Sequence, residues 1–245
     1  MTRIAILSDI HGNLPALEAV VADAQAQGCT GFVNLGDTLS GPLWPAETAD
    51  FLIARDWPTI AGNHERQLLT LPRDRMGASD LFARAQLNER HLAWLTAQPA
   101  SRSFAPDIFL CHGTPASDLD HYLFTVQPGG IRDAAEDELL ERSGARPERL
   151  ILCGHSHISG ERLLADGRRI ANPGSVGLQA YADDHPYSYV VENGDPRARY
   201  AIVEEYQVAL RQVDYDYAPA AAKADREGRP DWAIALRTGR MEPMA

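Results

Sequence analysis

Short apolar runs alternate with longer amphipathic segments along the 245 residues of this chain. After Asn13, apolar residues fall at positions i, i+3, i+4 and i+7, namely Leu17, Val20, Val21 and Ala24. This spacing predicts a helix with one buried face, for which Asn13 is the expected N-cap. Further helices are predicted at residues 45–55, 88–99, 131–143 and 219–239, and strands at residues 2–8, 32–35, 57–60, 107–110, 149–152, 168–170, 187–192 and 199–205. The alternation of strands with helices predicts an α/β fold.

The C-terminal part of the chain has a different pattern. Asn193-Gly194-Asp195-Pro196 is a strong turn signal between the predicted strands at residues 187–192 and 199–205. These two strands are therefore predicted to form a hairpin, which adds antiparallel pairing to the parallel strands. No linker of distinct composition divides the chain, so we expect one domain covering residues 1–245.

Composition narrows the classes of function. Lys and Arg number 23 and Asp and Glu 34, which gives a formal net charge of −11. An acidic surface repels polyanions, so bulk nucleic acid is not an expected partner and a nuclease is disfavoured. The chain has three widely spaced cysteines, Cys29, Cys111 and Cys153, and this odd number and spacing do not suggest a disulfide framework. We expect Cys111 and Cys153 in the core, because free cysteine is usually buried. Neither a leader nor a run of about 18 apolar residues is seen, so we expect a cytoplasmic protein without membrane contact.

Polar residues beside glycine follow five of the apolar runs. They are Asp9-Ile10-His11-Gly12, Gly36-Asp37, Gly62-Asn63-His64-Glu65, His112-Gly113 and Gly154-His155-Ser156-His157. Binding sites of α/β sheets form at the carboxyl ends of the strands, so these residues are expected to meet. Residues i and i+2 of an extended backbone point to the same side, which predicts that Asp9 and His11 share one ion. The same spacing predicts that His155 and His157 share one ion.

The residue types at these positions indicate a metal centre. Imidazole and carboxylate ligands without thiolate suit Mn, Fe, Zn or Ni better than Ca. About seven ligands are too many for one tetrahedral zinc and fit two divalent ions, with Asp37 as the natural bridge. Two such ions keep a positive charge of about one unit after Asp9, Asp37 and a bridging hydroxide are counted, so the site attracts an anion. Two divalent ions also activate water for displacement at phosphorus, which predicts phosphoester hydrolysis.

These motifs together resemble the calcineurin-like metallophosphoesterase family. The strings SDIHGN, HGTP and NPGSVG are similar to its bacterial and archaeal branch related to diadenosine tetraphosphatases, as are Asp214-Tyr215-Asp216 and Gly228-Arg229-Pro230 near the C-terminus. The resemblance implies a four-layer α/β/β/α sandwich. It also implies that members of the family are often homo-oligomers, an expectation that extends to this chain.

The resemblance further implies a role for each site residue. One ion would be held by Asp9, His11, Asp37 and His157, and the second by Asp37, Asn63, His112 and His155. His64 matches the catalytic histidine of the family, which supports the transition state or protonates the leaving oxygen. Glu65 stands where many members have Asp, so it is expected to alter how His64 is oriented. The implied reaction is attack of a metal-bound hydroxide on a small phosphorylated substrate, such as a nucleotide.

Several alternatives stay open at this point. The substrate can be a phosphodiester, a dinucleoside polyphosphate or a phosphomonoester, and a non-catalytic metal-binding scaffold or protein-interaction module is the alternative function. Asn13 is either a helix cap alone or also a contact of the substrate phosphate, and Arg66 is either a phosphate clamp or an ordinary surface ion.

Other aromatic and histidine residues carry weaker expectations. His121 lies in a polar loop that could border the substrate, His91 is expected at the surface and His185 in a turn. Trp44 and Trp57 are expected in the core. The helix near Trp232 either caps the site or forms an interface.

Overall fold

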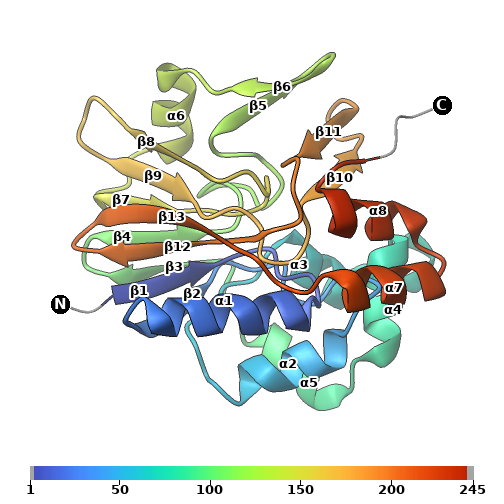
Figure 1. The fold of residues 1–245 in the computed structure, drawn as a ribbon. Coiled ribbons are helices and arrows are strands. Elements are labelled where there is room, and N and C mark those ends of the chain that lie inside the picture. Colours follow the sequence, from blue (N-terminus) through green and yellow to red (C-terminus); the bar gives the residue numbers. More distant parts are fainter. Residues whose placement is uncertain (1–2, 242–245) are drawn as a thin grey trace.

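Two β-sheets packed face to face form the centre of the computed structural model, which describes residues 3–241 (Figure 1). The first sheet has the strand order β13-β12-β1-β2 and contains β1 (Arg3–Leu7), β2 (Cys29–Asn34), β12 (Ala198–Glu204) and β13 (Gln207–Val213). The second has the order β3-β4-β7-β9-β8 and contains β3 (Ser101–Ala105), β4 (Ile108–Cys111), β7 (Leu150–Leu152), β8 (Gly160–Leu163) and β9 (Arg169–Asn172). β1 and β2 are parallel, as are β4, β7 and β9, so their carboxyl ends lie at shared sheet edges.

Helices cover the outer faces of the two sheets. Between the sheets, Ile6 and Val33 of the first pack with Leu110 and Leu152 of the second in one buried cluster. α1 (Leu14–Ala26) packs its apolar face on the outside of the first sheet, and α6 (Glu136–Ser143) inserts Leu139 into the cluster on the outside of the second. This arrangement confirms the predicted α/β/β/α layers.

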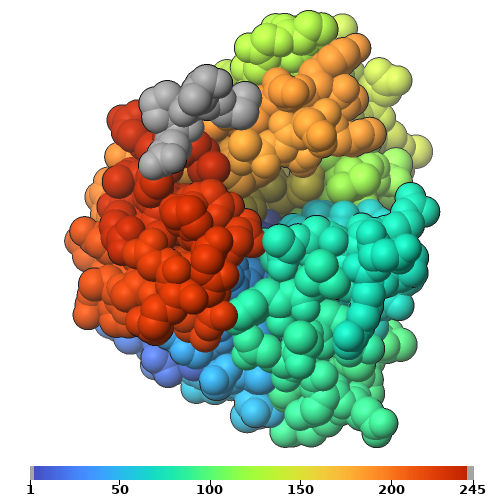
Figure 2. All heavy atoms as spheres, turned by 90° about the vertical axis from the view of Figure 1, so that its right-hand side faces the viewer, coloured from blue at the N-terminus to red at the C-terminus, as the bar shows by residue number. Residues whose placement is uncertain are grey.

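The remaining elements gather at the edge where the parallel strands end. One apolar cluster is shared by α2 (Pro45–Ile53), α3 (Asn63–Thr70), α4 (Ala78–Gln86) and α5 (Glu89–Thr96), and a 3₁₀ turn (Arg73–Arg75) joins α3 to α4. α7 (Ala218–Arg226) and α8 (Pro230–Thr238) pack together and against the hairpin of β10 (Ala180–Asp183) and β11 (Tyr189–Glu192). A second hairpin joins β5 (Phe124–Gln127) and β6 (Gly130–Asp133). Seen from this side, the surface is hollowed between α7–α8, the β10–β11 hairpin and the α3–α4 region (Figure 2).

The predicted hairpin across Asn193-Gly194-Asp195-Pro196 is wrong. β11 pairs with β10, whereas β12 pairs with β13 and β1. The Asn193 N–H donates to the Gln179 carbonyl and the Gly194 N–H to the Gly239 carbonyl, so other segments hold this turn. The chain therefore crosses from the small hairpin to the large sheet instead of reversing on itself.

Other local predictions need correction. Residues 131–143 form β6 followed by the shorter α6, because Gly130 and Ile131 pair with β5. Residues 57–60 make only an isolated bridge, between Thr59 and Asn34. His91 was expected at the surface but is 2% exposed, with its Nε2 3.2 Å from an Asp50 carboxylate oxygen.

Several other predictions are confirmed. All three cysteines are buried, and Trp44 and Trp57 pack partly buried against apolar clusters. The segment predicted as the last helix, residues 219–239, is helical on both sides of Gly228, where it divides into α7 and α8. None of the helices within residues 3–241 combines the length and apolarity that crossing a membrane requires.

The contact between the two sheets predicts a large stability effect at Ile6. This side chain is 1% exposed, so Ile6→Ala is expected to lower the free energy of unfolding by about 2–5 kcal/mol through a cavity that neighbouring residues fill incompletely. Leu163→Ala on β8 is the control, because Leu163 is 65% exposed and its loss is expected to change stability by less than about 0.5 kcal/mol. Urea denaturation with chelator present measures both, and equal midpoints would contradict the buried contact.

Candidate metal centre

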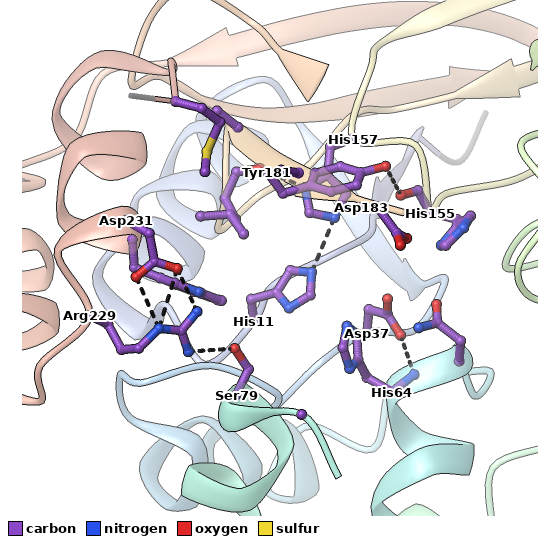
Figure 3. A pocket seen from close by; sticks show the side chains of 17 residues that line it. His11, Asp37, His64, Ser79, His155, His157, Tyr181, Asp183, Arg229 and Asp231 are labelled. Atoms are coloured by element: carbon purple, nitrogen blue, oxygen red, sulfur yellow. Dashed lines mark hydrogen bonds and ion pairs between the residues drawn. The ribbon is translucent and has the colours of Figure 1, made fainter. Parts of the chain in front are cut away.

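Two groups of buried Asp and His residues lie where the parallel strands of both sheets end. The first group is Asp9, His11 and His157, and the second is Asp37, His112 and His155. Within each group the candidate ligand atoms lie within 4.8 Å of one another. Asn63 opens α3 beside Asp37, and Figure 3 shows His11, Asp37, His155 and His157 around one cavity.

The grouping corrects one expectation drawn from residue spacing. Asp9 and His11 fall in the same group, as predicted, but His155 and His157 fall in different groups. β7 ends at Leu152, so both histidines lie beyond the strand, where the alternation of an extended backbone no longer applies. The assignment of these two histidines to separate ions, which the resemblance implies, agrees with the geometry.

Left-handed backbone conformations aim these side chains. The φ angles are +54° at Asp9, +53° at His11, +52° at Asp37, +66° at His155 and +58° at His157. Each such residue costs roughly 1–2 kcal/mol relative to a right-handed conformation. Backbone hydrogen bonds oppose that cost, since the Asp9 N–H donates to the Gly36 carbonyl and the His11 N–H to the Asp37 carbonyl, both at 3.0 Å. Strain that is concentrated on candidate ligands points to a functional site.

Backbone carbonyls fix the tautomer of each candidate histidine. The Nδ1 atoms of His11, His112 and His157 lie 2.8 Å from the carbonyl oxygens of Ser40, Leu35 and Leu178, respectively. In His155 the Nε2 atom is bonded instead, 2.8 Å from the Leu119 carbonyl. A carbonyl only accepts, so each bonded nitrogen carries the hydrogen and the other nitrogen of a neutral ring offers a lone pair to a metal.

The Nε2 atoms of His11 and His157 lie 3.1 Å apart. Both rings donate through Nδ1, and burial together with His157 lowers the pKa of His11 to about 3, so the His11 ring is neutral at pH 7. A cation between the two nitrogens satisfies lone pairs that otherwise face each other. The buried atoms Asp9 Oδ1 and Asn63 Oδ1 likewise have no hydrogen-bond partner among the described residues. The residues present therefore fit divalent ions.

The electrostatic surroundings of Asp37 keep its carboxylate ionised, as binding of a cation requires. Burial raises the pKa of Asp37, but His112 and His64 outweigh burial and hold this pKa well below its usual range. Burial lowers the pKa of His112, yet the Asp37 carboxylate, 3.0 Å from His112 Nε2, raises it to about 10. Asp37 is thus ionised at neutral pH in the middle of the two groups.

Two glycines allow the strand ends to approach each other. A Cβ added at Gly154 would meet the Ser8 Oγ and lie 3.0 Å from Asp9 Oδ2, and one added at Gly62 would meet Asp37 Oδ1. Any side chain at either position would displace a candidate ligand, which explains why glycine accompanies the polar residues in the motifs.

Glu65 does not orient His64, contrary to expectation. The Glu65 carboxylate accepts the N–H groups of Asp37, Thr38 and Gly62, each at 2.8 Å, and so holds the turn that carries Asp37. His64 is oriented by Asp80 of α4, whose Oδ1 lies 2.8 Å from His64 Nδ1. Sequence reasoning missed Asp80. Ser79-Asp80 ahead of Leu81-Phe82 is a helix-start signal that could have indicated α4, but not the contact with His64.

A cavity of about 470 Å³ opens above the two groups (Figure 3). His64 lines it, and the Asp37 carboxylate and the hydrogen bond to Asp80 outweigh burial to raise the pKa of His64 to about 9. The other walls come from β10, from the start of α4 and from the start of α8, through Tyr181, Asp183, Ser79, Arg229, Asp231 and Trp232.

Comparison with known proteins agrees with this geometry. The model of the calcineurin-like phosphoesterase superfamily domain matches residues 2–194. The chain belongs to the calcineurin-like phosphoesterase superfamily. It is 25% identical over 256 residues to an uncharacterised protein of Methanocaldococcus jannaschii, a match that covers 94% of this chain and 95% of that one.

Solved structures share the fold of this chain. A metallophosphoesterase from Sphaerobacter thermophilus superposes with a TM-score of 0.76 at 26% identity, covering 98% of this chain and 99% of the other. A hypothetical protein from Pyrococcus horikoshii gives a TM-score of 0.76 at 17% identity over 98% of this chain and 100% of the other. A proposed diadenosine tetraphosphatase gives 0.54 at 16% identity over 87% and 94%. The resemblance to the calcineurin-like family is confirmed.

Two residues of this chain lie in places that do not support the substrate contacts considered for them. Asn13 is fully buried, its Oδ1 accepts the Ala16 N–H as the cap of α1, and its Nδ2 donates to the Gly177 carbonyl and to Tyr215 Oη. No group of Asn13 is left for a substrate. The Arg66 guanidinium makes two hydrogen bonds to Asp118, at 2.7 and 2.8 Å, outside the cavity lining.

His121 borders the metal centre rather than the cavity. It is 3% exposed, its ring centroid lies 5.2 Å from that of His155, and its Nε2 lies 3.1 Å from Tyr189 Oη. The C-terminal helix lines the cavity through Trp232, which favours the expectation that it caps the site. Sequence reasoning missed four residues that line the cavity, because their segments have no polar motif at a strand end. They are Ser79, Tyr181, Asp183 and Asp231.

The three N–H groups that donate to Glu65 predict a stability effect. Glu65→Gln places an amide N–H against one of these donors, so we expect a loss of about 1–3 kcal/mol in the free energy of unfolding, together with weaker Mn²⁺ binding through displacement of Asp37. Glu205→Gln in the exposed β12–β13 turn is the matched control. Urea denaturation and calorimetric Mn²⁺ titration measure the two effects, and values equal to those of the control would show that Glu65 does not hold the turn.

Proposed function

We propose that this protein is a metal-dependent phosphohydrolase that uses two divalent ions. The observation that carries the proposal is the pair of facing Nε2 atoms of His11 and His157 beside two buried carboxylates at the base of a cavity. Superfamily membership supports phosphoester chemistry at such a centre.

The ligand sets follow the two groups in the structure. The proposed ligands of one ion are Asp9, His11, Asp37 and His157, and those of the other are Asp37, Asn63, His112 and His155. Asp37 is the proposed bridge, because its Oδ2 approaches His112 of the second group and its carboxylate can serve both ions. The donor set suits Mn, Fe, Zn or Ni. When bound, the two ions would activate water and neutralise charge on the phosphoryl oxygens.

His64 is the proposed catalytic residue. Its Nδ1 donates to the Asp80 carboxylate, which fixes the ring, and its backbone N–H donates to Asp37 Oδ1 at 2.9 Å. Among the described residues no hydrogen-bond partner is recorded for its Nε2, and the ring lines the cavity. Nε2 is therefore free to donate a proton to the leaving oxygen or to a charged phosphoryl oxygen. Asp80 is a positioning residue in this proposal.

The proposed substrate is a small phosphorylated molecule. A cavity of about 470 Å³ lies within the range of small-molecule sites. The net charge of −11 opposes binding of long nucleic acids. The substrate can be a phosphodiester, a dinucleoside polyphosphate or a phosphomonoester, and these are compared directly in the assay below.

Metal removal tests the proposed function. The protein stripped of metal is expected to be inactive, and added Mn²⁺ is expected to restore release of nitrophenol from bis(p-nitrophenyl) phosphate or p-nitrophenyl phosphate. Asp37→Asn is expected to abolish turnover of both, because it weakens the bridging ligand. The faster substrate indicates diester or monoester chemistry. Stoichiometric Mn²⁺ binding without turnover of these or of diadenosine polyphosphates would instead support the scaffold alternative.

A second prediction separates the role of His64 from metal binding. His64→Asn is expected to lower kcat by about 10²–10³ while metal content stays unchanged, since the side chain is not a proposed ligand. Asp80→Asn is expected to lower kcat by less, about ten-fold, because the ring remains but is less well held. His185→Asn, an exposed histidine in a bend, is the control. A His64→Asn variant with unchanged kcat, or with lost metal, would contradict the role.

A further inference from the structure

The start of α8 contributes three residues to the cavity, Arg229, Asp231 and Trp232, called here the C-terminal wall. The family match ends at residue 194, so this wall lies outside the segment that supplies the metal ligands. Figure 3 shows Arg229 and Asp231 on one side of the cavity and Asp37 and His64 on the other. A substrate phosphate held near Asp37 would therefore extend the rest of the molecule toward this wall.

Arg229 is held in place but keeps hydrogen-bonding capacity. Its Nε donates to Asp231 Oδ1 at 3.0 Å and its Nη2 to Asp231 Oδ2 at 2.7 Å. Its Nη1 donates to the Ser79 hydroxyl of α4 at 2.9 Å. A guanidinium has five N–H groups, so within the described residues one N–H on each terminal nitrogen has no partner. Because the side chain is 22% exposed and lines the cavity, these two groups can reach a ligand.

The charges around Arg229 decide what kind of acceptor it can bind. Asp231 balances the guanidinium, and Asp183 of β10 adds a second carboxylate to the same cavity. Asp183 lies beside His155, on the opposite side of the cavity from Arg229 (Figure 3), so the Arg229–Asp231 pair at this end has no net charge. This end of the cavity therefore offers no net positive charge to a further phosphate, whereas an uncharged oxygen can accept the free N–H groups without needing one.

The cavity has apolar surface in addition to the free N–H groups of Arg229. Leu178 and Ala180, together with the rings of Tyr181 and Trp232, line the same cavity, and the Trp232 ring lies near both His11 and Arg229. A flat or ring-shaped group with oxygen atoms at its edge would match this combination of apolar surface and donors.

We propose that Arg229 is a specificity-determining residue that donates to an uncharged hydroxyl or carbonyl oxygen on the group esterified to the phosphate. The substrate class that fits is a phosphoester of a nucleoside or sugar that carries no second phosphate. This inference rests on the proposed phosphohydrolase function, and it narrows the three open substrate types to those with a single phosphate.

The test compares three esters that release the same nitrophenol, assayed with the full-length Mn²⁺ protein. They are bis(p-nitrophenyl) phosphate, the p-nitrophenyl ester of thymidine 5′-phosphate, and the same ester with an added 3′-phosphate. The thymidine ester is expected to have the highest kcat/KM, and the 3′-phosphate to give no gain. Arg229→Ala is expected to lower kcat/KM for the thymidine ester by about ten-fold relative to bis(p-nitrophenyl) phosphate, mainly through KM. Arg229→Lys is expected to behave similarly, because it keeps the charge but loses the fork of donors.

A matched control and a charge change distinguish recognition from structural support. Arg237→Ala removes another α8 arginine, whose ion pair with Asp225 is exposed, and is expected to leave the substrate ratio unchanged. Asp231→Asn removes one negative charge from the wall, so relative kcat/KM for the 3′-phosphate ester is expected to rise several-fold. A merely structural role of Arg229 and Asp231 would lower all three activities together, and that result, or an unchanged ratio in Arg229→Ala, would overturn the proposal.

Equilibrium binding keeps this inference separate from catalysis. If no ester is hydrolysed, the proposed function fails, but calorimetric titration of the Mn²⁺ protein with thymidine 5′-phosphate still tests Arg229. A Kd at least ten-fold weaker in Arg229→Ala than in Arg237→Ala would sustain the contact. Equal Kd values, or no binding by the unaltered protein, would overturn it.

Discussion

The rest of the structure depends on holding together a group of buried nitrogen and carboxylate oxygen atoms that lie close to one another. The Nε2 atoms of His11 and His157 lie 3.1 Å apart, with the carboxylates of Asp9 and Asp37 beside them. Burying such groups without a compensating cation costs free energy. The structure offsets this cost with backbone carbonyls that fix the imidazole tautomers and with an apolar core between the sheets that keeps the strand ends in register.

The proposed chemistry and the proposed substrate selectivity come from different parts of the chain. Most of the proposed metal ligands follow strands of the two sheets, and Asn63 opens α3. Short helices outside the sheets supply Glu65, which holds the turn of Asp37, and Asp80, which holds His64. The segment beyond residue 194 adds the C-terminal wall. Under the proposed function, changes in α7 and α8 would alter which ester fits without displacing the candidate metal centre.

Residue spacing predicted which residues form the centre better than it predicted their arrangement. Strand ends rich in Asp, His and Gly are visible in the sequence because apolar runs mark the strands and glycine marks the close approaches. The pairing of His155 with His157 failed because both adopt left-handed conformations beyond β7, and no local pattern specifies those angles. The roles of Asn13 and Arg66 were open for a similar reason, since their partners Tyr215 and Asp118 are far away in sequence.

The sequence by itself determined the α/β class, the buried face of α1 and the set of candidate ligands, because these depend on periodicity and residue chemistry over a few positions. Only the tertiary structure decided that β11 pairs with β10 rather than β12, that Asp80 and not Glu65 orients His64, and that Arg229 faces the cavity. Each of these contacts joins segments whose proximity depends on how the sheets and helices pack. Local sequence patterns show which side chains could form a site, whereas the packing of sheets and helices determines which of those side chains come into contact.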